Sequence, residues 1–216
     1  MRLYTIQPAN VYHALLRGQS FRSEPFVHPE ADLDFQSAYD WLVGEMEQRC
    51  GRRPRGVTYP VWAWYLWEGK KKARPDLRYR RVRDNAIDGD AVLLTLDIGD
   101  ERVVLSDYDA WHHPLNYWFL GTAAQAEVFE AKCSAVRLSA YEHKPLPHPA
   151  LHSELIASWR GIFNKDGAPS MLEGMTDPTI SIQATFWELH PGDVVDVVGF
   201  GRIGKTRKLP PPRAAF

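Results

Sequence analysis

Residues 90–111 read DAVLLTLDIGDERVVLSDYDAW, and they bear most directly on the fold class. Apolar and β-branched residues flank a Gly-Asp pair at 99–100, a pattern that predicts two strands joined by a tight turn. Strands joined by so short a turn run antiparallel. We therefore expect an α+β fold with a mainly antiparallel sheet and flanking helices, rather than a doubly wound parallel sheet.

Upstream of this stretch, the sequence predicts a strand and two helices. RLYTIQ at 2–7 alternates and is rich in β-forming residues, which predicts the first strand. VYHALLRG at 11–18 has a short helical pattern with Asn10 as its N-cap. A longer helix is predicted over 35–51, where apolar residues recur at helical spacing.

Downstream, two more helices and two more strands are expected. Helical patterns cover 122–134 and 152–163, and Ser153 is available as the N-cap of the second helix. Strands are predicted at 179–189 and 193–201, because both segments are rich in β-branched and aromatic residues. The sequence HPGD between them is typical of a turn.

The totals fit one globular domain. The chain has 216 residues, of which 44% are apolar and 25% are charged, and its formal net charge is -1. We expect a single α+β domain over 1–204, followed by a mobile, basic, proline-rich tail over 205–216. Cys50 and Cys133 lack metal-ligand spacing, so we expect reduced thiols and no metal site. No stretch reaches the roughly 20 apolar residues of a membrane span, and we expect a cytoplasmic protein.

A further strand is predicted over 56–67, GVTYPVWAWYLW, and it leads into a strongly basic segment. Alternation places Trp62 and Trp64 on one face of this strand. Between Arg49 and Arg83 the chain carries 12 of its 26 Lys and Arg residues against two acids, so the near-zero net charge conceals a dipolar protein. A positive field attracts phosphate groups, and aromatic rings stack on unpaired bases at about 1–3 kcal/mol per base.

Two interpretations of this segment are open. In one, the tryptophans belong to the core and the lysines form a solvated turn. In the other, the segment is a basic, aromatic face for single-stranded DNA or RNA. The second is favoured because eight positive side chains within fourteen positions repel one another unless an anion offsets them. The expected contacts are Trp62, Trp64, Lys70, Lys71, Lys72, Arg78, Arg80 and Arg81.

Stretches at both ends of the chain occur in a recognisable combination. LYTIQ near the start and IQATFWEL near the end accompany a helix of the AYDWLVGEMEQR kind. In these features the chain resembles a bacterial family catalogued as a domain of unknown function, and the likeness covers most of the 216 residues. The resemblance to that family implies no activity.

The order of elements also resembles the ADP-ribosyltransferase fold, in particular the toxin-type transferases that modify bases in DNA. That resemblance implies a split-sheet core and NAD as the cofactor. It further implies that Tyr4, Thr5 and Gln7 of the first strand contact the cofactor. Arg22, in the loop SFRSE at 20–24, is the expected contact from the ligand loop.

The strand near the end departs from the pattern of those enzymes. Gln183 and Ala184 match its start, but Thr185 stands where the enzymes have a catalytic glutamate. Glu188 falls on the opposite side of a regular strand from Gln183. Three alternatives are open: a bulge turns Glu188 round, Gln183 serves instead, or the acid is absent. A protein that keeps only Gln183 lacks the charge that stabilises an oxocarbenium-like transition state, so it is a weak enzyme or a nucleotide binder.

LSDYDAWHHPLN at 105–116 offers further polar candidates at the end of a predicted strand. Asp107, His112 and Asn116 are placed there as loop residues with a positioning role. The stretch lacks a GxSxG nucleophile elbow, and its spacing matches no standard metal site. GFGRIG at 199–204 has the glycine spacing of a dinucleotide loop, but no βαβ unit follows it, so it carries little weight.

We therefore expect an NAD-binding, ADP-ribosyltransferase-like protein that transfers ADP-ribose to a nucleic-acid or protein acceptor held on the basic face. One alternative is a non-catalytic nucleic-acid-binding module of the PUA type, to which HPGD before a β-branched strand is similar. Another is a regulatory protein that binds an antitoxin or other acidic protein. The first hypothesis requires that the opening strand and the strand of Gln183 lie side by side and share a polar cavity.

Overall fold

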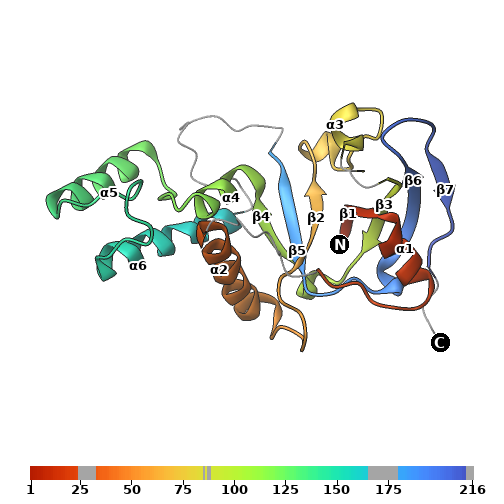
Figure 1. Ribbon diagram of the computed structural model, residues 1–216, viewed down its shortest axis with the longest axis horizontal. Coiled ribbons are helices and arrows are strands. Elements are labelled where there is room, and N and C mark those ends of the chain that lie inside the picture. Colours follow the sequence, from red (N-terminus) through yellow and green to blue (C-terminus); the bar gives the residue numbers. More distant parts are fainter. Residues whose placement is uncertain (24–32, 85, 87–88, 165–179, 213–216) are drawn as a thin grey trace.

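The computed structural model describes residues 1–23, 33–84, 86, 89–164 and 180–212. Its centre is a seven-stranded sheet in the order β4-β5-β2-β1-β3-β6-β7, in which each neighbouring pair is antiparallel (Figure 1). The prediction of an antiparallel α+β fold is therefore confirmed. The strands are β1 (Arg2–Pro8), β2 (Val61–Leu66), β3 (Ala91–Asp97), β4 (Val104–Asp107), β5 (Ile182–Phe186), β6 (Val194–Phe200) and β7 (Arg207–Leu209).

The helices flank the sheet, and two of them match the predicted helices closely. They are α1 (Ala9–Leu16), α2 (Leu33–Cys50), α3 (Arg80–Arg83), α4 (Tyr108–Leu115), α5 (Ala123–Ala135) and α6 (Pro149–Ser158). The helices α2 and α5 confirm the patterns at 35–51 and 122–134. The helix α1 begins directly after Pro8, so Asn10 is not its N-cap. In α6, His148 rather than Ser153 is the N-cap, because Pro149 with its fixed φ starts the helix.

The tight hairpin predicted from residues 90–111 is wrong. The strands β3 and β4 are present, but a 3₁₀ turn at Asp100–Arg102 separates them and they pair with different partners. β3 is buried along almost its whole length, and its two edges are occupied by β1 and β6. β4 therefore joins the sheet at the far edge, against β5, and α4 follows it where a loop was expected.

The C-terminal segment also differs from the prediction of a mobile tail. Arg207–Leu209 form β7, which pairs with β6 and closes one edge of the sheet. The Tyr12 hydroxyl of α1 donates a hydrogen bond to the Pro210 carbonyl at 2.9 Å. Lys208 is ion-paired with Asp196 of β6. These contacts hold the segment against the domain; residues 213–216 lie outside the described part.

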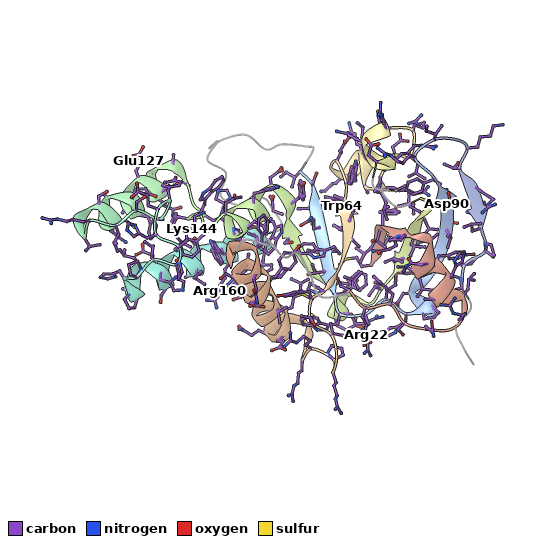
Figure 2. All side chains as sticks on the ribbon, in the orientation of Figure 1. Arg22, Trp64, Asp90, Glu127, Lys144 and Arg160 are labelled. Carbon is purple, nitrogen blue, oxygen red and sulfur yellow. The ribbon has the colours of Figure 1, made fainter. Side chains whose placement is uncertain are left out.

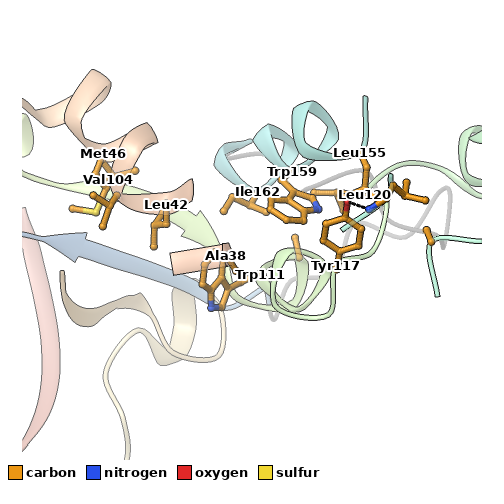
Figure 3. Close-up of a cluster of buried hydrophobic side chains, with 14 of the residues drawn as sticks. Ala38, Leu42, Met46, Val104, Trp111, Tyr117, Leu120, Leu155, Trp159 and Ile162 are labelled. Atoms are coloured by element: carbon orange, nitrogen blue, oxygen red, sulfur yellow. Dashed lines mark hydrogen bonds between the residues drawn. The ribbon is translucent and has the colours of Figure 1, made fainter. Parts of the chain in front are cut away.

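Apolar clusters cover both faces of the sheet. On one face, α1 packs Val11 and Leu15 against Leu3 and its neighbours on the central strands. On the other face, at the β4 end of the sheet, α2, α4 and α6 enclose a second cluster that includes the fully buried Trp159 (Figure 3). The indole of Trp159 donates a hydrogen bond to the Trp118 carbonyl at 2.8 Å. The helices α5 and α6 extend outward beyond β4 as a helical lobe (Figure 1).

The sheet opens between β1 and β2. Every residue of β1 from Arg2 to Pro8 has a partner on β3, but the ladder between β1 and β2 has the single partner pair Tyr4 and Trp64. On its other side, β2 pairs continuously with β5 from Val61 to Trp64. The strands β1 and β2 therefore separate beyond their one shared position, and side chains rather than a backbone ladder fill the space between them.

Candidate functional site

A row of side chains crosses four adjacent strands and marks the centre of the site. Ser106 of β4 is opposite Gln183 of β5, Gln183 is opposite Trp64 of β2, and Trp64 is opposite Tyr4 of β1. Directly opposed residues in antiparallel strands share one face of the sheet. The four side chains thus lie on the same face, between the helical lobe at one end and α3 at the other (Figure 1).

A cavity of about 390 Å³, which we name the polar pocket, lies where β1 and β2 separate. The loop after α1 closes one side of it, because Phe21 pairs with Leu189 and Ser23 pairs with Tyr59 through isolated bridges. The described residues that line the polar pocket are Thr5, Ile6, Gln7, Phe21, Ser23, Val61, Trp62, Ala63, Trp64, Trp67, Tyr108 and Gln183.

Thr5 and Gln7 form the β1 side of the polar pocket. The buried Thr5 Oγ1 donates to the Trp62 carbonyl at 2.9 Å, across the gap where the backbone ladder is missing. Gln7 Nε2 donates to Thr5 Oγ1, also at 2.9 Å. These two bonds fix both side chains against the pocket wall, so that a hydroxyl and an amide are held in place without a ligand.

Gln183 lines the polar pocket from β5, whereas Ser106, opposite it on β4, is not among the lining residues. Both hold a buried oxygen with no hydrogen-bond partner in the part of the chain that the structure describes. These oxygens are Gln183 Oε1 and Ser106 Oγ. The two residues are directly opposite each other, so their Cβ atoms are about 5 Å apart. A buried polar atom left without a partner costs about 1–3 kcal/mol.

Three aromatic rings in contact with one another line the polar pocket. Trp67 meets Trp64 edge-on with their ring centroids 4.6 Å apart, and Trp64 lies 5.2 Å from Tyr108. Trp62 also lines the polar pocket, but it packs against Trp111 at 5.4 Å and belongs mostly to the helical lobe's core. Trp62 therefore belongs partly to the core, as the first interpretation expects, and Trp64 lines the polar pocket.

A second cavity of about 780 Å³, which we name the cationic pocket, adjoins the first at Trp67. It lies under the segment between β2 and β3, with Tyr4 of β1 and Val198 of β6 at its base. The described residues that line the cationic pocket are Tyr4, Trp67, Glu68, Lys70, Lys71, Lys72, Ala73, Arg74, Pro75, Asp76, Leu77, Arg78, Tyr79, Arg83, Val198 and Thr206.

Several cations of this segment already have acidic partners. Lys72 and Arg81 both pair with Glu68. Arg78 pairs with Asp76 at 2.6 Å, and its side-chain hydrogen bonds lower the pKa of that carboxyl group. Arg80, on α3, lies 4.0 Å from Asp84, and neither Arg80 nor Arg81 is among the residues that line the cationic pocket.

Three other cations are available to an anion. Lys70, Lys71 and Arg74 are exposed, line the cationic pocket, and form no ion pair within the described ranges of the chain. Arg83, by contrast, donates to the carbonyls of Leu77 and Gly204, at 2.6 and 2.8 Å, and so ties α3 to the loop after β6. Lys70, Lys71 and Arg74 are therefore the exposed cations of the cationic pocket that have no ion-pair partner among the described residues.

Arg22 and Glu188 do not reach the polar pocket. They bind each other instead, with 2.7 Å between Arg22 Nε and Glu188 Oε1. Phe21 and Ser23 face the pocket, and Arg22 between them faces away, as alternation along an extended segment requires. Figure 2 shows Arg22 and Trp64 at different heights along the sheet. Glu24, the last residue of the expected ligand loop, lies outside the described residues.

The polar candidates after β4 have roles in the architecture of α4. Asp107 is the N-cap of the helix and accepts a hydrogen bond from the Ala110 amide at 3.0 Å. Asn116 Nδ2 donates to the His112 carbonyl at 2.7 Å at the other end. None of the three candidates lines the polar pocket among the residues described, and no cluster of three or more metal-binding side chains occurs there. Burial lowers the pKa of the neighbouring His113.

The structure brings together part of the site that the sequence predicts. Thr5, Gln7 and Gln183 share the polar pocket with Trp62 and Trp64. Tyr4 lines the cationic pocket with Lys70, Lys71, Lys72 and Arg78. The strands β1 and β5 are not direct neighbours, because β2 lies between them, but both reach the polar pocket.

Sequence reasoning missed Ser106, Trp67 and Tyr108 as residues of this site. Trp67 was part of the aromatic stretch, but its place at the junction of the two pockets depends on the turn after β2. Tyr108 lies at the start of α4, a helix that the sequence did not predict. Ser106 belongs to the polar stretch at 105–116, but only the pairing of β4 with β5 places it opposite Gln183.

Comparisons with known proteins complete the description. No helix in the described part of the chain has the length and apolar character needed to cross a membrane. Searches of curated proteins and of solved structures gave no significant match. One family model matches residues 2–195, which is nearly the whole chain. The protein therefore belongs to the family described as "Domain of unknown function (DUF3841)".

Proposed function

We propose that the protein binds NAD with its nicotinamide–ribose end in the polar pocket and transfers ADP-ribose from it. One observation carries the proposal: three separate segments converge on that pocket. They are β1 through Thr5 and Gln7, the loop after α1 through Phe21 and Ser23, and β5 through Gln183. These are the segments from which the resemblance to ADP-ribosyltransferases implies contacts to the cofactor.

The side chains in the polar pocket suit this end of NAD. The amide of Gln7 and the hydroxyl of Thr5 are held at the wall, where they can hydrogen-bond to ribose hydroxyls. Gln183 Oε1 has no partner in the described chain, so its amide can turn to accept from a ligand N–H or O–H group. The ring of Trp64 offers a stacking face for an aromatic heterocycle.

The chemistry of the pocket predicts a slow enzyme. Bound NAD supplies a glycosidic bond that breaks with nicotinamide taking the electron pair, while an acceptor nucleophile bonds to the ribose carbon and releases a proton. A carboxylate stabilises the positive charge that develops, but the described residues of the polar pocket include none. Gln183 can orient a ribose hydroxyl without supplying charge, and Glu188 is engaged by Arg22.

The acceptor that the surface favours is single-stranded nucleic acid rather than protein. Lys70, Lys71 and Arg74 are exposed and unpaired in the described chain, and the rings of Trp67 and Tyr79 lie in the same cavity. Phosphate-binding cations beside stacking rings are typical of single-strand recognition. The same observation supports a second candidate function, in which the protein binds nucleic acid without catalysis.

Incubation with radiolabelled NAD and with separate single-stranded DNA, RNA and protein acceptors tests the proposal. We expect NAD to raise the melting temperature and label to pass to a nucleic-acid acceptor. Gln7→Leu should abolish the thermal shift. The matched control Gln19→Leu should preserve the shift, because Gln19 is an exposed glutamine outside the pocket. If NAD causes neither a shift nor transfer while oligonucleotides still bind, the second candidate replaces the first.

A further inference from the structure

The positive segment that is continuous in sequence is divided in space by β2. One group of cations lies in the loop between α2 and β2, and the other lies in the turn after β2, at the opposite end of the strand (Figure 1). A six-residue strand such as β2 spans roughly 20 Å. We name the groups the loop pole, which consists of Arg52 and Arg55, and the pocket pole, which consists of Lys70, Lys71 and Arg74.

Both poles consist of cations that have no acidic partner in the described ranges. Arg52 and Arg55 are exposed and form no ion pair there, although Arg53 between them lies 3.7 Å from Glu47 and donates to the Thr58 carbonyl. The pocket pole is likewise exposed and unpaired within the same limits. Each pole repels its own charges, and bound phosphate groups would offset that repulsion.

Residues of the polar pocket, several of them aromatic, lie between the two poles. Ser23 is bridged to Tyr59 beside the loop pole and lines the polar pocket. Trp64 follows at the centre, and Trp67 links the polar pocket to the cationic pocket beside the pocket pole. A ligand that touches both poles therefore passes the mouth of the polar pocket and the ring of Trp64.

We propose that one single-stranded nucleic acid lies along β2, with phosphates on both poles and an unpaired base against Trp67. A single strand fits better than a duplex, because aromatic side chains stack only on bases whose faces are open. Its role as the acceptor of ADP-ribose rests on the proposed function, whereas its binding does not. A strand of about four nucleotides, the lower end of known site sizes, is expected to reach from pole to pole.

Fluorescence anisotropy with labelled oligo-dT and oligo-rU of three, six and twelve nucleotides tests this path. We expect affinity to rise steeply between three and six nucleotides and only weakly beyond. DNA and RNA both offer phosphodiesters and open bases, so the comparison of the two oligomer series shows which of them the protein prefers. A duplex of the same length and a poly-glutamate peptide are the competitors. If either competes as well as the single strand, the proposal is overturned.

Paired variants locate the strand at both poles. Arg52→Gln with Arg55→Gln, and separately Lys70→Gln with Lys71→Gln, should each weaken binding of the six-nucleotide strand about tenfold. Each should also reduce the salt slope by about 1.4, at about 0.7 per phosphate contact. The control pair, Arg17→Gln with Arg137→Gln, removes the same charge from exposed positions elsewhere and should change neither quantity.

The trinucleotide separates a spanning strand from a general charge effect. It is too short to reach both poles. Its affinity should therefore fall in the pocket-pole variant or in the loop-pole variant, but not in both. Wild-type affinity in the loop-pole variant would overturn the path. The increase in melting temperature with NAD should persist in both variants. If NAD does not raise the melting temperature of the wild-type protein, that result counts against the proposed function and not against the path of the strand.

Discussion

At position 183 a neutral amide lies in a pocket whose described residues include no carboxylate. Gln183 lines the polar pocket, opposite Trp64 on one side and Ser106 on the other. If the pocket holds the ribose of NAD, Gln183→Glu should raise the rate of ADP-ribosyl transfer by about tenfold or more, because the carboxylate stabilises the transition state. Rates of label transfer at fixed NAD concentration measure this.

Gln183→Leu is the matched control for that gain. It keeps the approximate size of the side chain, adds no charge and removes the amide's hydrogen-bonding groups, so transfer should fall below the wild-type rate. A Gln183→Glu protein that remains folded, binds NAD and transfers no faster than wild type would argue against a catalytic location for position 183. Circular dichroism of both variants checks that each is folded.

Substitution of Ser106 tests whether its buried hydroxyl group lacks a hydrogen-bond partner. Ser106 is 2% exposed, and its Oγ has no hydrogen-bond partner in the described chain. Ser106→Ala should therefore leave the free energy of unfolding unchanged or raise it by up to about 1 kcal/mol. Thr185→Val is the comparison, because the buried Thr185 Oγ1 donates to the Val104 carbonyl at 3.3 Å, and losing that bond should cost about 1 kcal/mol. Urea denaturation measures both; a loss above about 2 kcal/mol for Ser106→Ala would mean that the hydroxyl is bonded.

At the scale of elements, the pair formed by Arg22 and Glu188 ties the loop after α1 to the end of β5. Glu188 is also not among the described residues that line the polar pocket. Glu188→Gln should therefore leave NAD affinity and transfer rate within about twofold of wild type, and it should cost at most about 1 kcal/mol of stability, as partly exposed pairs do. A collapse of transfer with unchanged stability would restore Glu188 as the catalytic acid.

The helix α4 carries a pH dependence through His113. Burial lowers the pKa of His113 below the 6.5 of an unperturbed imidazole, against smaller opposing effects of the Ala110 backbone and Asp107. The unfolded chain then binds a proton more readily than the folded one, so the free energy of unfolding should decrease as pH falls below about 6.5. His113→Gln should reduce that decrease in urea titrations at pH 7.5 and 5.5. An identical pH dependence in the variant would contradict this assignment.

The elements that the sequence predicts correctly are those with strong local signals. The helix around 35–51 has a regular apolar period, and α2 confirms it. The partners of β3 and β4 could not be predicted, because β3 pairs with β1 and β6 and β4 pairs with β5, and these strands are distant in sequence. The helix α4 was missed because it has eight residues, including Pro114 near its end and two histidines in its last turn.

The same division applies to the site. Thr5, Gln7 and Gln183 could be predicted, because the resemblance assigns roles to strands that β2 brings to one pocket. Arg22 and Glu188 bind each other instead, and neither is among the described residues that line that pocket. The neutralisation of Lys72 and Arg81 by Glu68 also required the fold, since these residues come together only where the turn after β2 meets α3.

For the whole molecule, the central feature is an opening in a continuous sheet. Helices cover the β4 end of a sheet face and the segment between β2 and β3 covers the other end (Figure 1). The polar pocket lies where β1 and β2 separate, and the cationic pocket lies under that segment. The uneven distribution of charge follows this architecture, because the segments on either side of β2 carry the cations and β2 itself carries aromatic residues. A fixed field of this kind raises the local concentration of anionic ligands and accelerates their association.

The most direct measurement is a crystal structure of the protein grown with NAD. We expect ligand density in the polar pocket, with the ribose within hydrogen-bond distance of Gln7 and Gln183 and a ring against Trp64. A ligand bound elsewhere, with Gln183 unchanged and the pocket holding only solvent, would contradict the claim that β1 and β2 separate to hold the cofactor.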